Sequence, residues 1–332
     1  MQVLAHSKYF PPYYLPNGHL QTIYPALFRK VKNVHYHRER IHTPDIDFLD
    51  LDWSEVSADK LVIISHGLEG DSQRPYVKGM VQAFNKIGYD ALAWNFRGCS
   101  GTMNKTLRFY HSGATDDLHL VLKHTISKGK YTEIVLIGFS LGGNLTLKYL
   151  GEQGTGLPAF VKKAVTFSVP LDLYGSSRQI EKPANYVYKQ RFLRSLKNKI
   201  KTKASLMPGK LSTKGLDKIR SIYDFDDQYT APLHGFGNAR NYYTQCSAIH
   251  FLSHIRIPTL IVNAQNDSFL SKTCYPNEDQ LENPHVLFEA PHHGGHCGFK
   301  PRIQNPLGCY WSEHRAIEYV YVKGTSEKLD FS

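Results

Sequence analysis

The pentapeptide Gly138–Phe139–Ser140–Leu141–Gly142 holds the residue types that can make a hydroxyl group reactive. It follows the apolar run 133–137, which predicts a buried strand. A serine between glycines at a strand end is typical of a nucleophile elbow, a strained turn in which small neighbours avoid collisions with adjacent elements. The helix expected over 141–150 would stabilise negative charge beside the hydroxyl. Ser140 is therefore the candidate nucleophile.

A second glycine-flanked turn, His66–Gly67–Leu68–Glu69–Gly70, follows the apolar run 60–65. In folds that carry a nucleophile elbow, such a turn supplies the first backbone donor to an oxyanion. We expect the backbone N–H groups of Leu68 and Leu141 to be the two donors. His66 is interpreted as a hydrogen-bonded turn histidine rather than a catalytic one.

A serine hydroxyl becomes a good nucleophile when a histidine takes its proton, and the histidine needs a carboxylate that fixes its tautomer. In folds that carry a nucleophile elbow, the three catalytic residues follow one another along the chain in the order serine, acid, histidine. Asp267 lies just after the apolar run 259–264, where the orienting acid belongs. The alternative is an aspartate that only caps the following turn. We predict that Asp267 is the acid.

Three histidines, His292, His293 and His296, follow the apolar run 286–290. His296 lies on a glycine-containing loop that can reach the elbow, whereas the other two adjoin the strand end, so His296 is the predicted base. No cysteine or carboxylate at a recognised ligand spacing accompanies them, and we expect no metal and no cofactor.

The elements that must position these residues alternate along the chain. The segments 34–41 and 47–53 have the alternating pattern of an antiparallel hairpin. Short apolar runs then alternate with amphipathic segments, which predicts an α/β fold with a mostly parallel central sheet and helices on both faces. The expected strands are 61–65, 91–96, 133–139, 164–169, 259–264 and 286–290, and the expected helices are 74–87, 115–128, 141–151 and 310–322. We expect one domain over residues 1–332.

About ninety residues separate the strands expected at 164–169 and 259–264, far more than one crossover helix needs. Residues 172–250 are therefore predicted to form a helical cap insertion over Ser140. Within it, residues 189–220 hold eleven Lys or Arg and one acid. This basic run is either a solvated helix face, which we favour, or a surface for weak contact with anionic lipid head groups. The N-terminal aromatic residues are expected to pack beneath the cap rather than lie on lipid; they are Tyr9, Phe10, Tyr13, Tyr14 and Tyr24.

Composition narrows the functional class. The chain has 332 residues, 41% of them hydrophobic, and a formal net charge of +11. The excess charge is local to 189–220, so nucleic acid is not an expected partner. The longest apolar runs are far short of a membrane span, and residues 1–8 lack the pattern of a secretory signal. Five scattered cysteines, without a paired spacing, fit free thiols in a cytoplasmic protein.

Several motifs together resemble the AB hydrolase 4 family of α/β-hydrolases, which includes YheT-like hydrolases and medium-chain esterases or ester synthases. The resemblance covers nearly the whole chain and is carried by Phe10–Pro12, Asn17–Thr22, His66–Gly70, Asn95–Gly98, Tyr110–Gly113, Gly138–Asn144, Gly235–Phe236, Tyr242–Ala248 and His293–His296.

The resemblance implies a carboxylester hydrolase, a serine esterase whose triad falls on Ser140, Asp267 and His296 and whose substrate is a small ester or lipid. Members of the family act on short or medium acyl esters, transfer acyl groups to alcohols, or cleave phospholipids or monoacylglycerols. Hydrolysis of short- to medium-chain esters or acylglycerol-type lipids is the leading expectation. An alcohol O-acyltransferase and a peripheral-membrane phospholipase are the alternatives.

Overall fold

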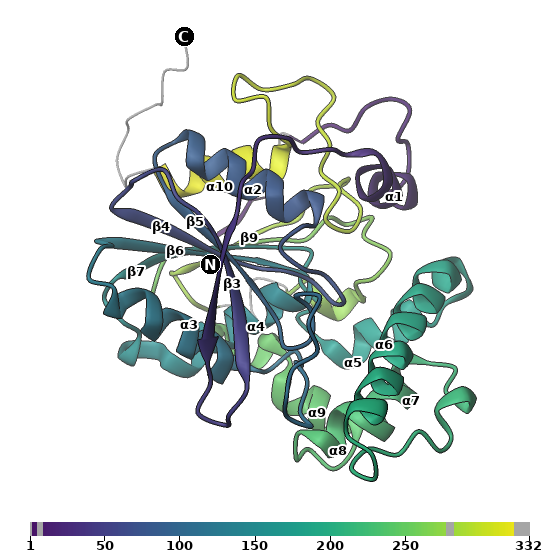
Figure 1. The fold of residues 1–332 in the computed structure, drawn as a ribbon. Helices are drawn as coiled ribbons and strands as arrows, with labels where there is room; N and C mark the ends of the chain where they lie inside the picture. Colours follow the sequence, from purple (N-terminus) through teal and green to yellow (C-terminus); the bar gives the residue numbers. More distant parts are fainter. Residues whose placement is uncertain (1, 5–8, 277–281, 322–332) are drawn as a thin grey trace.

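The computed structural model describes residues 2–4, 9–276 and 282–321. A nine-stranded sheet runs through the molecule in the order β1-β9-β8-β7-β6-β4-β5-β3-β2 (Figure 1). All pairings are parallel except β2 with β3 and β3 with β5. The strands are β1 (Gln2–Leu4), β2 (His37–His42), β3 (Phe48–Ser54), β4 (Lys60–Ser65), β5 (Asp90–Asn95), β6 (Glu133–Phe139), β7 (Val161–Phe167), β8 (Thr259–Val262) and β9 (Val286–Glu289). The predicted α/β fold and the antiparallel hairpin at one edge are confirmed.

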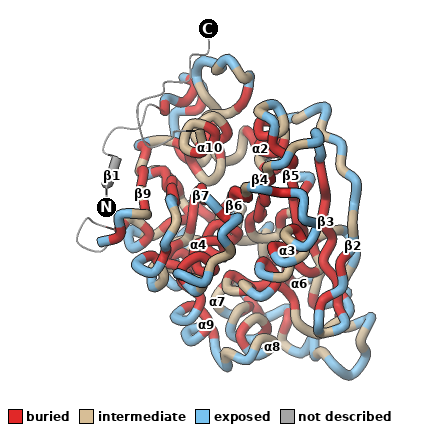
Figure 2. The backbone as a smooth tube through the Cα atoms, turned by 90° about the vertical axis from the view of Figure 1, so that its left-hand side faces the viewer, coloured by how far each residue is buried: buried red, intermediate tan, exposed pale blue. Residues whose placement is uncertain are grey.

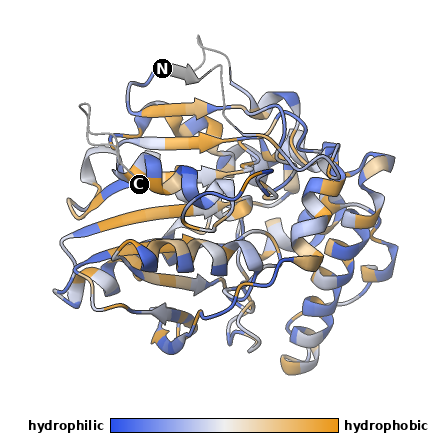
Figure 3. Cartoon of the chain, turned by 90° about the horizontal axis from the view of Figure 1, so that it is seen from above, coloured by the Kyte–Doolittle hydropathy of each residue, from blue (hydrophilic) through white to orange (hydrophobic). Residues whose placement is uncertain are grey.

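Side chains alternate between the two faces of the sheet, and each face is covered by a pair of helices. Ile63 of β4 and Leu136 of β6 pack against α3 (Thr115–Ser127) and α4 (Leu141–Gln153). Val62 and Ile64 face the opposite way, toward α2 (Pro75–Lys86) and α10 (Trp311–Tyr321). Figure 2 shows the central strands as buried, and Figure 3 shows their hydrophobic character. The continuous apolar runs are explained by burial on both faces.

Between β7 and β8 the chain forms helices with a hydrophobic core of their own. These helices are α5 (Leu173–Ile180), α6 (Tyr186–Leu206), α7 (Ile222–Phe225), α8 (Ala231–Leu233) and α9 (Ala239–Cys246). Leu193, Leu196 and Ile200 of α6 pack with Ile222 and Phe225 of α7, away from the sheet. Figure 1 shows these helices at one side of the molecule, with α6 standing apart from the layers around the sheet.

The N-terminal segment differs from its expected packing. Tyr9 is buried between Phe299 and Trp311. Phe10, Tyr13 and Tyr14, by contrast, are exposed. The prediction that the aromatic residues pack beneath the cap is wrong for these three and for Tyr9, which packs with α10 instead. The segment then forms a helix that the sequence analysis did not predict, α1 (Gly18–Phe28), which begins where the Asn17 side chain accepts a hydrogen bond from the N–H of Leu20.

No helix in the described ranges is both long and apolar enough to cross a membrane. All five cysteines are free thiols.

Candidate active site

Ser140 lies in a sharp turn between β6 and α4. Its φ of 53° and ψ of −120° are unusual for a residue with a Cβ atom, so the backbone is strained at the residue that carries the hydroxyl. A Cβ atom at Gly138 would lie 2.6 Å from the Gly142 carbonyl oxygen, and one at Gly142 would lie 2.4 Å from the carbonyl oxygens of Ser65 and His66. The two glycines let the turn pack tightly against the end of β4.

Ser140, His296 and Asp267 form one hydrogen-bonded chain. The Ser140 Oγ lies 2.9 Å from His296 Nε2, and His296 Nδ1 lies 2.8 Å from Asp267 Oδ2. The other Asp267 oxygen accepts the N–H of Phe269 at 2.9 Å, which fixes the carboxylate. Phe269 also stacks on the imidazole, with 4.2 Å between ring centroids. The carboxylate therefore accepts from Nδ1, and Nε2 is left to accept the serine proton.

The electrostatics of this chain favour a basic imidazole. Burial by itself lowers the pKa of His296, but the Asp267 carboxylate and Cys297 outweigh burial and raise the pKa above its ordinary value of 6.5. The other two histidines of the loop have different neighbours, Gln265 for His292 and Asn266 for His293. The structure thus brings only His296 to the serine.

Helix α1 holds the His296 loop in place, a role that the sequence analysis missed. The His296 N–H donates to Thr22 Oγ1 at 2.8 Å. Gln21, which is buried, accepts from the Gly294 N–H and from the Asn266 side chain with the same oxygen. These three bonds connect α1 to the loops that carry the histidine and the acid. The cap residue Asn17 was the available sequence signal for this helix.

The two expected oxyanion donors lie beside Ser140. Leu68 and Leu141 line the same cavity as Ser140 and His296. Leu141 is the first residue of α4, so its N–H has no partner within the helix. Among the described residues the Leu68 N–H has no hydrogen-bond acceptor, whereas the N–H groups of Gly67 and Glu69 donate to Tyr76 and Tyr110. Neither N–H group has an internal acceptor among the described residues, as an oxyanion donor requires.

His66 has a structural place behind this turn. Its Nε2 accepts the Phe96 N–H at 3.1 Å, so its Nδ1 carries the proton and donates to the Gly67 carbonyl at 2.8 Å. Burial lowers the pKa of His66 to about 3, which keeps the imidazole neutral. The interpretation of His66 as a turn histidine agrees with this geometry.

Glu69 connects the turn His66–Gly70 to α6. We call this turn the oxyanion turn, because it carries the expected donor Leu68. The φ of 53° at Glu69 is strained, and the Glu69 carboxylate accepts hydrogen bonds from Tyr110 at 2.6 Å, from Lys199 at 2.8 Å and from Ser195. Ser195 and Lys199 are one turn apart on α6. The side chain of Glu69 is only 6% exposed, so this ion pair is shielded from solvent.

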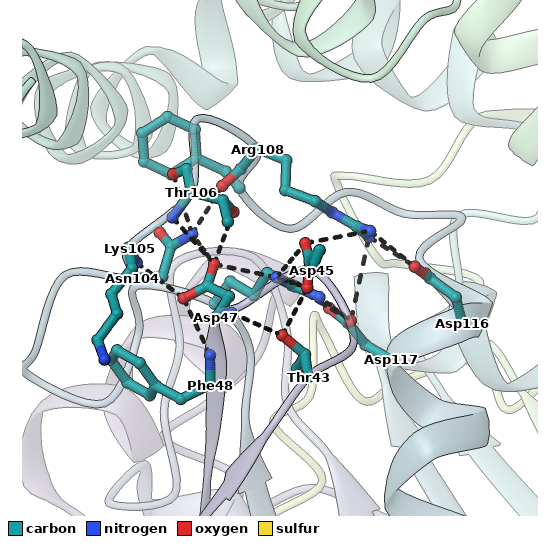
Figure 4. A network of polar contacts seen from close by, with 12 residues as sticks. Thr43, Asp45, Asp47, Phe48, Asn104, Lys105, Thr106, Arg108, Asp116 and Asp117 are labelled. Carbon is teal, nitrogen blue, oxygen red and sulfur yellow. Dashed lines mark hydrogen bonds and ion pairs between the residues drawn. The ribbon is translucent and has the colours of Figure 1, made fainter.

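A second lysine, Lys203, fastens α6 to the loop after β5. Its ammonium group donates to the Asn104 side chain and to the carbonyls of Thr106 and Arg108. Figure 4 shows how Asn104 and Thr106 then converge on Asp47, at the start of β3. The basic run is therefore not simply a solvated face, because Lys199 and Lys203 point into the protein.

Two cavities meet at the serine and histidine. One, of about 120 Å³, lies under the helices between β7 and β8 and is mostly apolar. The other is a groove of about 340 Å³ between α1 and the start of α6. Five residues line both spaces, namely Leu68, Ser140, Phe192, Phe269 and His296. A molecule bound at Ser140 can thus extend in two directions.

Known proteins share this architecture. Residues 60–302 match the α/β hydrolase fold family. An esterase of Pyrococcus furiosus, Pf2001, superposes with a TM-score of 0.58 at 18% identity, covering 88% of this chain and 94% of its own. That level of identity bears on the fold alone.

Two relatives with clearer sequence similarity are named for ester or lipid chemistry. The esterase-like YheT protein of Escherichia coli is 38% identical over 89% of this chain and 88% of its own length. Phospholipase ABHD3 of Mus musculus is 29% identical over 95% of this chain and 78% of its own. The chain is an esterase- and lipase-like hydrolase that belongs to the α/β-hydrolase family, in the AB hydrolase 4 group with YheT and ABHD3.

Proposed function

We propose that this protein is a serine carboxylesterase that hydrolyses short- to medium-chain esters or acylglycerol-type lipids through an acyl-enzyme. The observation that carries the proposal is the hydrogen-bonded chain from Ser140 through His296 to Asp267, at the junction of an apolar cavity and an open groove. Serine, histidine and aspartate in this order of contacts are the parts that acyl transfer requires.

The proposed reaction follows from the position of each group. His296 takes the Ser140 proton as Oγ attacks the ester carbonyl, and the Leu68 and Leu141 N–H groups stabilise the oxyanion. His296 then gives the proton to the leaving alcohol, and the acyl group stays on Oγ. Water enters, His296 removes its proton, and the carboxylic acid leaves as Oγ regains a proton.

The two spaces suggest where the two halves of the ester lie. The acyl chain fits the apolar cavity, where Leu196 of α6 and Ile222 of α7 provide the walls. The leaving alcohol fits the groove, which opens toward Arg191. We propose that residues 172–250 act as a cap, because helices of this segment line both spaces.

A series of p-nitrophenyl esters from acetate to palmitate tests the proposal. Each buried methylene stabilises binding by about 0.8 kcal/mol, so kcat/KM should rise to a short- or medium-chain optimum and then fall. Leu196→Phe, which narrows the cavity, should shift the optimum to shorter chains while acetate turnover changes little. Turnover that survives in Ser140→Ala would reject the proposal.

The same assay with added alcohol separates hydrolysis from alcoholysis. The acyl-enzyme is common to both, so the ratio of ester to acid among the products measures whether alcohol or water is the better acceptor. A product dominated by ester at low alcohol concentration would make the acyltransferase the correct function.

A further inference from the structure

The mouth of the groove between α1 and α6 is rich in exposed apolar side chains. Of fourteen large apolar or aromatic side chains that are exposed in the described chain, nine belong to three segments at this mouth. They are Phe10, Tyr13, Tyr14, Leu20, Leu27, Phe28, Tyr186, Val187 and Ile303. We call this set the apolar rim.

Contacts show that much of the rim is continuous. Leu27 and Val187 line the groove from opposite helices. Phe28, Tyr24 and Tyr14 form a chain of ring contacts with 5.2 and 5.7 Å between centroids. The imidazole of His19 stacks on Tyr188 of α6. Figure 1 shows α1 and α6 on the same side of the molecule.

The loop after β9 closes the other side of the rim. Arg302 lies 3.9 Å from the centre of the Tyr13 ring and 5.7 Å from that of Phe10. The next residue, Ile303, is 82% exposed. The loop therefore adds both an apolar side chain and a cation to the rim.

The three segments around this mouth carry an excess of positive charge. Residues 9–32, 182–216 and 290–312 contain no Asp or Glu, and they hold three, ten and two Lys or Arg, respectively. Acids from elsewhere pair with these segments. Glu69 with Lys199 and Glu313 with Arg29 are nearly buried pairs, Glu181 pairs with Lys189, and the exposed Asp217 pairs with Lys201. The cations that remain at the mouth include Lys30, Lys32 and Arg191, all exposed.

From the apolar rim and its cations we infer that this face docks on the surface of an anionic lipid bilayer. Exposed aliphatic and aromatic side chains enter the boundary between head groups and acyl chains, while lysine and arginine pair with anionic head groups. Exposed apolar patches bordered by charge are typical of such contacts. A lipid leaving the bilayer would enter the groove directly and reach Ser140. This last step rests on the proposed function; the docking itself does not.

The docking face differs from the basic segment 189–220 that the sequence suggested for membrane contact. Lys199 and Lys203 of that segment are bonded within the protein and are not available to lipid. The start of α6, the segment 10–30 and the loop around Arg302 provide the contact instead.

Co-sedimentation with vesicles tests the inference, with phosphatidylcholine alone compared with a mixture containing about one third phosphatidylglycerol. The protein should sediment with the anionic vesicles and less with the neutral ones, and salt at about 0.5 M should weaken the binding. Phe10→Ser/Phe28→Ser/Ile303→Ser should reduce the partition coefficient at least tenfold. None of these three side chains lines the groove, so hydrolysis of a water-soluble ester should stay within about twofold of wild type, which reports an intact fold.

Matched controls separate this face from general stickiness. Ile46→Ser/Val56→Ser/Phe160→Ser removes three exposed apolar side chains outside these three segments and should bind like wild type. Lys30→Gln/Lys32→Gln should weaken anionic binding more than Lys123→Gln/Lys162→Gln.

Equal binding by the rim and control variants, or no sedimentation of wild type, overturns the inference. Loss of a concentration-dependent dimer in the rim variant, without any vesicle binding, would likewise overturn it, since the rim would then be a contact between two copies. Ser140→Ala should bind vesicles like wild type, so the docking result stands apart from the test of catalysis.

Discussion

At the scale of single residues, the site is organised around the environment of His296. Its Nδ1 faces a carboxylate that is fully buried, and its Nε2 faces a hydroxyl on a strained turn. The Asp267 carboxylate makes the His296 imidazole more basic. The strained turn conformation holds the Ser140 hydroxyl clear of the backbone. The sequence predicted these three residues because each lies in the segment that follows an apolar strand, and parallel strands end at one edge of the sheet.

The dependence of the reaction on pH tests the pairing of His296 with Asp267. In the proposed reaction His296 acts as a base only when it is unprotonated, and Asp267 raises its pKa, so kcat/KM should rise with pH through an apparent pKa above 6.5. An unperturbed histidine would give a value of about 6 to 7. Asp267→Asn should lower this apparent pKa and reduce kcat by about a thousandfold. Surface Asp224→Asn is the control and should change neither; an acid limb that is identical in Asp267→Asn and wild type would show that another group sets it.

At the scale of elements, α6 connects the pocket to the oxyanion turn. It lines both cavities through Phe192, and it bonds to Glu69 through Ser195 and Lys199. Sequence reasoning predicted helices here but read the lysines as a solvated face, because spacing alone does not tell which turn of a helix meets a buried acid. It also missed α1, since prolines at positions 11, 12, 16 and 25 obscured the helix that Asn17 begins.

Cutting the bond between α6 and Glu69 should affect catalysis more than binding. In Lys199→Met the Glu69 carboxylate loses its cation, and the adjoining Leu68 N–H should lose its fixed direction. We expect kcat to fall about tenfold or more with KM within about threefold of wild type.

Lys189→Met is the matched control, because it removes an ion pair between α6 and Glu181 that lies away from the oxyanion turn. Comparable losses of kcat in both variants would mean that only the general docking of α6 matters. The pH profile should stay unchanged in both, since neither lysine contacts His296.

At the scale of the whole molecule, buried polar groups fasten the antiparallel edge of the sheet to the remainder. Asp47 is fully buried and accepts from Arg97, Asn104, Thr106 and two further backbone N–H groups, as Figure 4 shows in part. Burial alone would raise the pKa of Asp47, but these hydrogen bonds outweigh burial and hold the pKa well below its ordinary value. Alternating patterns predicted the hairpin, whereas a network between residues fifty positions apart leaves no local pattern to read.

Asp47→Asn should therefore destabilise the fold in a pH-dependent way. A carboxyl group whose folded pKa is lowered stabilises the protein above its unfolded pKa, near 4, and loses this effect as pH falls through the folded value. We expect a loss of about 3 kcal/mol at pH 7, because an acceptor of Arg97 is removed from a buried network. Thermal unfolding across pH measures it, and the difference from wild type should shrink in acid; a constant difference at all pH values would contradict the assignment.

The central claim is that Ser140 is a nucleophile activated by His296, and labelling with a fluorophosphonate followed by peptide mass spectrometry tests it most directly. The probe should modify Ser140 alone in the wild type, and labelling should be lost in Ser140→Ala and slowed by orders of magnitude in His296→Ala. His292→Ala and His293→Ala should label nearly as fast as wild type, because neither histidine contacts the serine. Modification at another residue, or full-rate labelling of Ser140 in His296→Ala, would contradict the account.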